Sequence, residues 1–392
     1  MREVWIISGA RTPIGSYGKT LKDISSTELG VIAAKEAIKR AGVPTDQIDD
    51  VLIGNCMMRS DEINVARCIA LKSGLPFTVP AATIQRQCSS SMQALAFATQ
   101  QIMCGDSEVV LVGGTESMSR VPYALYDMRW GARMGNKAAV DMLTEGLEDP
   151  LLRYHMGITA ENLAAKHGIS RQDQDELAFT SQKRAVAAIK SGRFRDEIVP
   201  VPIPQRKGDP VMFANDEHPR EDASMESLAA LKPAFKKDGT VTAGNASGLN
   251  DGASAAIVAS KEKAQALGLK PLAKIISHGL AGVEPELMGY GPVPAMGKAM
   301  KKAGMTLADI QLVECNEAFA AQYVTVERLL GLRREITNVN GSGIALGHPV
   351  GCTGLRIVIT LLHEMTKRDL TVGAATLCVG GGMGMATIIE RV

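Results

Sequence analysis

Hydrophobic and polar positions alternate along the chain in two periods, one typical of short buried strands and one typical of amphipathic helices. The apolar run Val4–Ile7 predicts a strand, and the stretch ELGVIAAKEAIKR places apolar residues three and four positions apart, as a helix does. The following AGVPTDQIDDVLIGN predicts a turn and then a second short strand. Strands that alternate with helices in this way predict an α/β protein with layered sheets.

The same order of elements occurs twice. AGVPTDQIDDVLIGN, which starts at Ala41, resembles AGMTLADIQLVECNE, which starts at Ala303, and each follows an amphipathic stretch. A second helix and strand also recur, as CSSSMQALAFATQQIMCGDSEVVLVGG and CTGLRIVITLLHEMTKRDLTVGAATLCVGG. Ile6-Ile7-Ser8 has a counterpart in Ile275-Ile276-Ser277. Chance similarity between α/β units could imitate one such match, but the ordered recurrence of two blocks favours a duplication.

The middle of the chain matches neither half. It contains RVPYALYDMRWGARMGN, a helical pattern in QDQDELAFTSQKRAVAAIKSG and a loop-rich run from Val199 to Lys237. Such an insertion either carries binding surface or is solvated and structurally neutral. We expect an N-terminal half at residues 1–119 and 248–270, an inserted loop domain at 120–247, and a C-terminal half at 271–392.

Composition excludes several classes of protein. The 392 residues are 45% hydrophobic and 22% charged, with a net charge of +1. No charge bias indicates nucleic acid or an anionic membrane as partner. No apolar run reaches the ~18 residues of a membrane span, and the start of the chain lacks a signal-peptide pattern, so we expect a soluble, cytoplasmic protein. The seven cysteines form no C-x-x-C pair, which disfavours disulfides, a zinc site or any other bound metal.

Cys88 is the first candidate for chemistry. In IQRQCSSSMQALAFATQQI it separates an apolar run from a helical pattern that begins around Ser89–Met92. Unpaired N–H groups at a helix start favour a thiolate, and the small serines would leave room for a substrate. A lone Cys at a strand–helix turn is structural as often as catalytic.

His348 is the second candidate, in the segment GSGIALGHPVGCTG at 341–354. A His between Gly and Pro in a Gly-rich loop projects from a specially shaped turn, where a base would be positioned, although an incidental His would look the same. The phosphate-loop pattern G-x-x-x-x-G-K-[ST] is absent.

Two further segments end apolar runs. Cys378 is followed by Val379 and three glycines, which let a backbone approach a ligand and offer N–H groups. Asn316 opens the sequence Asn-Glu-Ala-Phe-Ala after Leu312–Cys315. Each residue has an ordinary structural alternative. Cys378 could be a core thiol, and Asn316 could cap a turn.

Taken in order, these four segments resemble thiolases, and the resemblance extends from Arg2 to Val392. It includes NASGLNDGA at Asn245–Ala253 and HMGITAENLA at His155–Ala164. The resemblance implies two βαβαβαββ halves in a five-layered α/β/α/β/α arrangement with a loop domain inserted in the first half. It also implies a homotetramer, or else a dimer, with Arg120–Asn136 at the place of the tetramerisation segment.

Three positions depart from the common thiolase pattern. Ser91 stands where many thiolases have Gly, Ser342 where Gly or Ala is common, and Cys352 where Ser, Ala or a similar small residue is typical. All three side chains are small, so the family assignment is unaffected.

The resemblance gives each catalytic part a residue. Cys88 would attack the thioester or ketone and carry the acyl group, His348 would take its proton, and Cys378 would exchange the α-proton of acetyl-CoA. Asn316 would hold a water that stabilises the enolate with His348, and the N–H groups of Cys88 and Gly380 would form an oxyanion hole. Kinetics should be ping-pong, with no bound cofactor and with coenzyme A (CoA) and acetyl-CoA as substrates.

The same resemblance implies residues around CoA and its acyl group. We expect Arg220 and Ser227 near the nucleotide of CoA. We expect Phe235, Ala243 and Ser247 along its pantetheine arm. At the acyl end we expect His155, Met156 and Phe319. For Arg220 the alternative is a solvated charge, and for Phe235 and Phe319 it is ordinary core.

Met156 indicates the short-chain subclass, so we expect an acetyl-CoA C-acetyltransferase that condenses two acetyl-CoA reversibly. A broad-chain degradative 3-ketoacyl-CoA thiolase is the alternative. Condensing enzymes of fatty-acid and polyketide synthesis pair their Cys with His–His or His–Asn. A second catalytic Cys at 378 and a CoA-binding insertion disfavour that class. A non-catalytic acyl-CoA-binding relative would lack Cys88, His348 or Cys378, and cysteine spacing gives no support to a redox protein.

Overall fold

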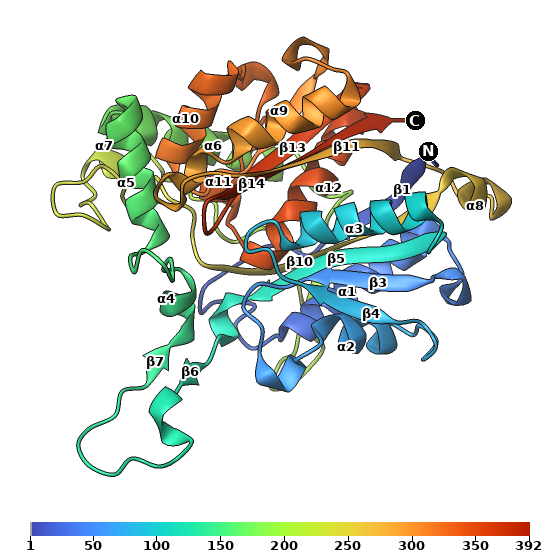
Figure 1. Cartoon of the computed structure of the whole chain (residues 1–392), viewed down its shortest axis with the longest axis horizontal. Coiled ribbons are helices and arrows are strands. Elements are labelled where there is room, and N and C mark those ends of the chain that lie inside the picture. The colour runs from blue at the N-terminus through green and yellow to red at the C-terminus, as the bar shows by residue number, and fades with distance from the viewer. Residues whose placement is uncertain (1) are drawn as a thin grey trace.

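The computed structural model describes residues 2–392, which form one large mixed sheet covered by helices (Figure 1). The strand order is β12-β13-β14-β11-β1-β10-β5-β3-β4, with the short β2 beside β10. The two halves of this sheet meet where β1 and β11 pair, through only Trp5 opposite Lys274 and Ile6 opposite Ala273.

The elements fall into three groups along the chain. The first half contains β1 (Val4–Arg11), β2 (Gly15–Ser16), α1 (Ser26–Ala41), β3 (Asp50–Gly54), α2 (Val65–Lys72), β4 (Ala81–Ile84), α3 (Ser90–Cys104), β5 (Val109–Ser117), β10 (Asn250–Ser260) and α8 (Lys261–Ala266). The second contains β11 (Ala273–Gly282), α9 (Pro292–Ala303), β12 (Leu312–Cys315), α10 (Ala320–Leu330), α11 (Gly343–Leu346), α12 (Val350–Arg368), β13 (Val372–Val379) and β14 (Met383–Arg391). Between β5 and β10 lie β6 (Tyr123–Ala124), β7 (Val140–Asp141), α4 (Met142–Gly146), α5 (Met156–His167), α6 (Arg171–Lys190), β8 (Val201–Ile203), β9 (Val211–Phe213) and α7 (Met225–Ala229).

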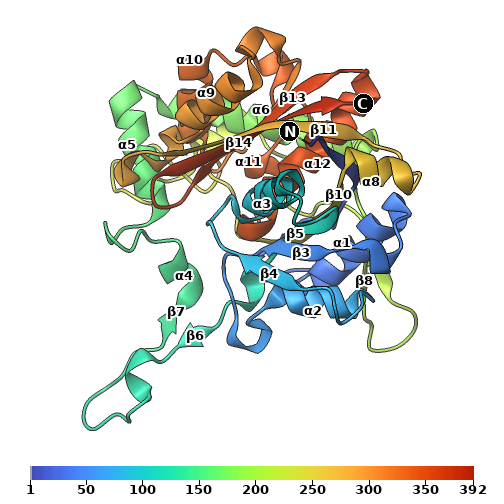
Figure 2. The ribbon, with the colours of Figure 1, turned by 45° about the vertical axis from the view of Figure 1, so that its right-hand side comes forward.

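Helices cover both outer faces and fill the centre. α1 packs on β1, β5 and β10, α9 packs on β11 and β14, and α3 and α12 pack against each other between the two halves of the sheet (Figure 2). Met92 and Leu95 of α3 share one buried apolar cluster with Leu355 and Ile359 of α12. α12 is buried along nearly its whole length between the two halves, whereas α3 leaves Phe97, Gln100 and Cys104 exposed on one face. The five-layered α/β arrangement is confirmed.

The duplication is visible in matching irregularities of the two halves. β1 shifts register just before Ser8, and β11 does so just before Ser277. Ser8 Oγ donates to the carbonyl of Ala37 at 2.7 Å, and Ser277 Oγ donates to that of Ala299 at 2.8 Å. Each bulge therefore aims a serine at the helix that covers its strand, which unrelated α/β units would not share.

The C-terminal half follows the expected βαβαβαββ order, with one strand shortened. Its third strand is reduced to a single bridge between Val313 and Thr337, because Asn338 takes over the pairing that a strand would make. Asn338 adopts a φ of 48°, donates through Nδ2 to the carbonyl of Cys315 at 2.7 Å and accepts the N–H of Cys315 at 2.8 Å. The chain is thereby free to form the loop that leads to α12.

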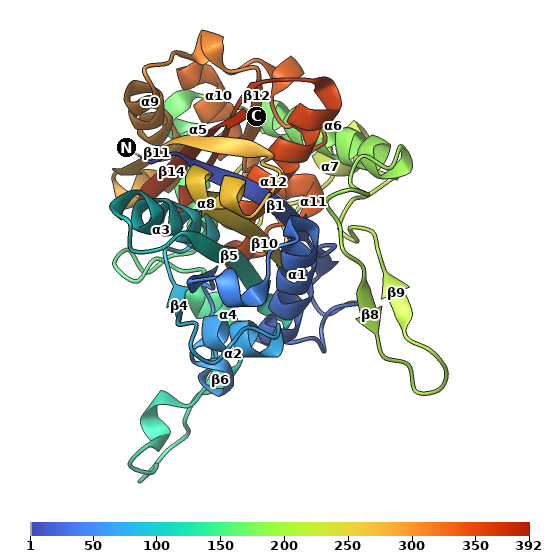
Figure 3. The ribbon, with the colours of Figure 1, turned by 90° about the vertical axis from the view of Figure 1, so that its right-hand side faces the viewer.

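The middle segment contains few regular elements. The loop-rich run from Val199 to Lys237 holds only the β8–β9 hairpin and the short helix α7 (Figure 3). The short ribbon of β6 and β7 begins an arm that projects from the body of the protein (Figure 1). Within residues 2–392, no helix combines the length and apolarity that crossing a membrane requires.

Candidate active site

The Cys88 turn connects the edge strand β4 to α3. Gln87 adopts a φ of 45°, which turns the chain sharply before the helix starts at Ser90. Ser89 Oγ donates to the carbonyl of Arg86 at 3.0 Å, and Ser90 Oγ donates to that of Gln87 at 2.6 Å. Both of these small serines, which we expect from the sequence to leave room for a substrate, are fully buried and hold the turn together.

The Cys88 thiol keeps its proton in the free protein. Removal of the sulfur from water raises the pKa of Cys88 to about 11, although N–H groups of Gly380 and of Cys88 itself act in the opposite direction. Backbone N–H groups therefore lower the pKa of Cys88, as expected for a thiol at a helix start, but burial raises that pKa by more. A nucleophilic Cys88 therefore needs a base.

His348 is held in the loop between α11 and α12. Its backbone N–H donates to Asn250 Oδ1 at 2.9 Å. In its ring, Nδ1 lies 2.6 Å from Thr353 Oγ1, and within residues 2–392 Nε2 has no hydrogen-bond partner. Burial, and to a lesser extent the charge of Arg356, lowers the pKa of His348 to about 3. The imidazole is neutral at ordinary pH, as a general base must be.

Cys378 and the glycines after it form the end of β13 and the turn into β14. Burial raises the pKa of the Cys378 thiol well above its ordinary value, and the nearby thiols of Cys88 and Cys315 add to the effect. Gly382 has a φ of 79°, and a Cβ there would lie 2.5 Å from the carbonyl oxygen of Val283. Glycine is thus required for the turn that carries Gly380, whose N–H lowers the pKa of the Cys88 thiol.

One cavity of about 990 Å³ brings most of the expected site residues together. Its lining includes Cys88, His155, Met156, Arg220, Phe235, Ala243, Ser247, Phe319, His348, Cys378 and Gly380. Ser227 lines instead a smaller neighbouring cavity of about 160 Å³, which also contains Arg220 and Ala243. The groups that could carry the chemistry thus share one space with the groups expected around CoA.

Asn316 does not line this cavity. It is fully buried directly after β12, where its N–H donates to the carbonyl of Thr376 at 2.9 Å. In the described part of the chain neither polar atom of its side chain has a hydrogen-bond partner. An unpaired buried amide is costly, and a small polar molecule such as water would satisfy it.

Aromatic rings form one wall of the cavity. The rings of His155 and Phe235 stack with centroids 4.6 Å apart, and Phe235 meets Phe319 edge-on at 6.0 Å. His155 also caps α5, since its Nδ1 accepts the N–H of Gly157 at 3.0 Å. A Cβ on Gly157 would lie 2.3 Å from the Phe235 ring, so Gly157 leaves the space that this ring occupies.

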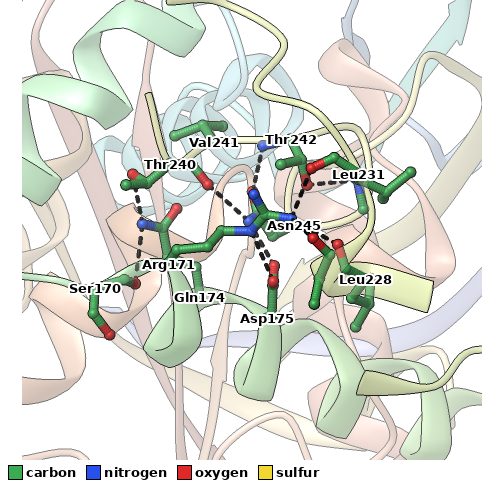
Figure 4. Close-up of polar contacts among 12 residues, drawn as sticks. Ser170, Arg171, Gln174, Asp175, Leu228, Leu231, Thr240, Val241, Thr242 and Asn245 are labelled. Atoms are coloured by element: carbon green, nitrogen blue, oxygen red, sulfur yellow. Dashed lines mark hydrogen bonds and ion pairs between the residues drawn. The ribbon is translucent and has the colours of Figure 1, made fainter. Parts of the chain in front are cut away.

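The segment that carries Phe235, Ala243 and Ser247 is tied to α6 by buried polar contacts (Figure 4). Arg171 Nε donates to Asp175 Oδ2 at 2.7 Å, and Asn245 Nδ2 donates to Asp175 Oδ1 at 2.9 Å. An irregular segment held in this way presents its side chains to the cavity in fixed positions.

Glu116 is a buried carboxylate beside the cavity that the sequence did not reveal. Its carboxylate accepts N–H bonds from Cys56 at 3.0 Å, Met57 at 3.1 Å and Gly351 at 2.8 Å, and one from Asn55 Nδ2 at 2.9 Å. Burial raises the pKa of Glu116 to about 7, against the effect of these donors. The only sequence signal is a carboxylate at the end of the apolar strand VVLVGGTES.

Comparison with known proteins gives a consistent result over the whole chain. Residues 4–262 match the family described as thiolase, N-terminal domain, and residues 269–391 match the thiolase C-terminal domain. An acetyl-CoA acetyltransferase of Chromobacterium violaceum is 52% identical over 99% of this chain and 100% of its own length. The Bacillus anthracis acetyl-CoA acetyltransferase superposes with a TM-score of 0.98 at 52% identity, covering 100% of this chain and 99% of its own. Human mitochondrial 3-ketoacyl-CoA thiolase in complex with CoA superposes with a TM-score of 0.96 at 45% identity. The match covers 100% of this chain and 98% of the human one.

Proposed function

The chain belongs to the thiolase family, and we propose that it is an acetyl-CoA C-acetyltransferase that condenses two acetyl-CoA to acetoacetyl-CoA and CoA, reversibly. The observation that carries this proposal is that Cys88, His348, Cys378 and Gly380 line one cavity. These are a nucleophile, a neutral base, a second thiol and a backbone donor, the parts that acyl transfer to carbon requires.

In the first half-reaction Cys88 accepts the acetyl group. His348 Nε2, which is neutral and unpaired, takes the proton of the thiol, and the thiolate attacks the thioester carbonyl. The N–H groups of Cys88 and Gly380, which lower the pKa of the Cys88 thiol, would donate to the oxyanion as it develops. CoA then leaves with the proton held by His348.

In the second half-reaction a carbon nucleophile attacks the acetyl-enzyme. His348, neutral again, takes the proton of the Cys378 thiol, and the Cys378 thiolate then removes the α-proton of the second acetyl-CoA. A water held by the unpaired Asn316 amide stabilises the enolate together with His348. Formation of the carbon–carbon bond releases the Cys88 thiolate, which takes its proton back from His348. The kinetics are ping-pong because the first CoA leaves before the second acetyl-CoA reacts. Cys378 gives its proton back in the reverse direction.

CoA would extend from the reactive end of the cavity towards the insertion. Arg220 and Ser227 would contact its nucleotide end, Phe235, Ala243 and Ser247 its pantetheine arm, and His155, Met156 and Phe319 its acyl group. The support is that all of these except Ser227 line the cavity, while Ser227 lies in the adjoining one. CoA acts as substrate, and no bound cofactor takes part in these steps.

The test is acetylation at a single thiol. Incubation of the purified protein with acetyl-CoA should place one acetyl group on Cys88, located by peptide mass spectrometry. Cys88→Ala should abolish the adduct and the turnover of acetoacetyl-CoA, whereas Cys104→Ala, at an exposed cysteine, should preserve both. An adduct at another residue, or a fully active Cys88→Ala variant, would contradict the mechanism.

The oligomeric state is part of the proposal. We infer a homotetramer joined by the arm between β6 and β7, because Trp130 is 92% and Met134 91% exposed there, which an isolated chain would leave in water. Replacing both by Ala should reduce the mass measured by sedimentation equilibrium while Cys88 acetylation persists. An unchanged mass would contradict the role of the arm. The cytoplasmic location expected from the sequence stays a prediction.

A further inference from the structure

Thr353 is the only hydrogen-bond partner of the His348 ring within residues 2–392. His348 Nδ1 lies 2.6 Å from Thr353 Oγ1, and Thr353 Oγ1 lies 3.0 Å from the carbonyl oxygen of Pro349. Thr353 is fully buried and His348 is 6% exposed. Competition from bulk water is therefore weak, and the protons must be distributed among these three groups.

Counting hydrogens leaves two arrangements. A threonine hydroxyl has one hydrogen to donate, and a neutral imidazole has one N–H. If Thr353 donates to Nδ1, the ring proton lies on Nε2, which has no acceptor in the described structure and cannot act as a base. If Thr353 donates to the Pro349 carbonyl, its oxygen accepts from Nδ1–H, and both hydrogens are used.

The position of Thr353 in α12 favours the second arrangement. α12 begins at Val350, and Thr353 lies in its first turn, so its hydroxyl points back to the carbonyl four residues earlier, as helical threonines commonly do. The backbone at His348 is fixed by two neighbours. Gly347 has a φ of 101°, and Asn250 accepts the backbone N–H of His348 at 2.9 Å. His348 is thus held through its backbone and through ring Nδ1, and ring Nε2 remains available to the cavity.

We propose that Thr353 is a positioning residue that keeps the proton of His348 on Nδ1 and so leaves Nε2 as the base for Cys88. The inference rests on the proposed function, in which His348 Nε2 takes that proton. When the proton moves, the S–H bond of Cys88 breaks and an N–H bond forms at Nε2. The Nδ1–H bond to Thr353 remains, and Thr353 itself transfers no proton. The imidazolium that forms keeps a hydrogen-bond acceptor at Nδ1, which stabilises its charge.

The first test reads the proton directly on the wild-type protein. Neutron diffraction from crystals exchanged into D₂O should show deuterium on His348 Nδ1, directed at Thr353 Oγ1, and a hydroxyl deuterium directed at the Pro349 carbonyl. Deuterium on Nε2 with a bare Nδ1 would overturn the proposal. This measurement does not depend on any variant or on turnover.

The second test compares two variants by single-turnover acetylation of Cys88. Thr353→Val keeps the shape but removes the hydroxyl, and acetylation at saturating acetyl-CoA should slow about 10–100-fold, a part of what a general base contributes. Thr353→Ser keeps the hydroxyl and should stay within about threefold of wild type, and KM should change less than about threefold in both variants, because substrate binding is not involved. Wild-type rates in Thr353→Val, or an equal loss in Thr353→Ser, would overturn the proposal.

The two proposals can fail separately. A wild-type protein that is never acetylated at Cys88 would refute the proposed function, while deuterium on Nδ1 would still support the tautomer. If Thr353→Val does not fold, the neutron map and Thr353→Ser decide the matter. Normal acetylation combined with deuterium on Nε2 would refute the role of Thr353 alone.

Discussion

Ser91 Oγ donates to the carbonyl oxygen of Cys352 at 3.0 Å and accepts the N–H of Leu355 at 2.9 Å. This hydroxyl joins α3, which follows Cys88, to α12, which follows His348. The side chain is fully buried between the two halves of the protein. At a position where many thiolases have glycine, this chain has a polar bridge between its two catalytic helices.

Removal of this bridge should destabilise the protein. Ser91→Ala leaves a buried carbonyl without one of its partners, and we expect the free energy of unfolding to fall by about 1–3 kcal/mol. Urea unfolding followed by circular dichroism measures the change. Ser191→Ala, at the exposed end of α6, is the control, since its hydroxyl bonds only its own helix and the expected change is below about 0.5 kcal/mol. Equal effects of the two substitutions would show that the bridge contributes nothing.

The two thiols should separate experimentally. Cys378→Ala should still accept an acetyl group at Cys88 but should lose exchange of the α-protons of a thioester with solvent deuterium, because the base for the carbon acid is absent. His348→Ala should impair acetylation itself. Mass spectrometry of the peptide and of the recovered thioester measures both steps. Exchange at the normal rate in Cys378→Ala would show that another group is the carbon-acid base.

Substrate length should depend on Met156. A Met side chain in the acyl end of the cavity fills volume that a longer chain needs, and a hydrophobic wall discriminates by about 10–200-fold per methylene. We expect a strong preference for acetoacetyl-CoA over 3-ketohexanoyl-CoA and negligible turnover of ten-carbon substrate. Met156→Ala should raise the relative kcat/KM on six carbons and leave Cys88 acetylation intact. Equal wild-type efficiency on four and ten carbons would favour the degradative subclass.

Gly157 should control the position of the aromatic wall. A Cβ at this position collides with the Phe235 ring, so Gly157→Ala must displace the ring, which lines the cavity proposed for CoA. We expect KM for acetyl-CoA to rise about tenfold, the equivalent of about 1.4 kcal/mol of lost binding. Gly297→Ala in α9 is the matched control, because nothing lies within 4 Å of its added Cβ and alanine favours a helix. Unchanged KM in Gly157→Ala would mean that the Phe235 ring does not contact CoA.

His278 should make the protein sensitive to acid. Burial lowers the pKa of His278 from 6.5 to about 4, so the unfolded chain binds a proton that the folded protein excludes. Stability contributed by this group is complete above pH 6.5 and is lost as the pH falls from there towards 4, by about 1.4 kcal/mol between about pH 7.5 and 5.5.

The measurement for His278 compares two pH profiles. His278→Gln retains polar atoms for Thr387 and Thr99 but does not titrate, so its free energy of unfolding should fall less with acid than that of wild type. Urea unfolding at a series of pH values gives the difference between the slopes. Parallel profiles would show that His278 does not titrate in this range.

Local patterns in the sequence predicted much of this protein. The periodicity of apolar residues gave the helices α1, α3 and α9, and the repeated blocks gave the two halves, because a hydrophobic face must recur with the period of its own element. The positions of Cys88, His348 and Cys378 were also predictable, because each lies where a strand or loop ends beside small residues, in segments that resemble one family.

Only the tertiary structure determined which residues far apart in the chain are in contact and how their contacts change protonation. The buried Glu116 accepts the N–H of Gly351 across the two halves, Ser91 accepts the N–H of Leu355, and Asn316 is buried without lining the cavity. None of these contacts leaves a periodic or local signal, because the partners are far apart in the chain. The protonation of Cys88 also depends on how much water the whole fold removes from the thiol. The helix start alone favours the thiolate, and only the packing around it reverses that preference.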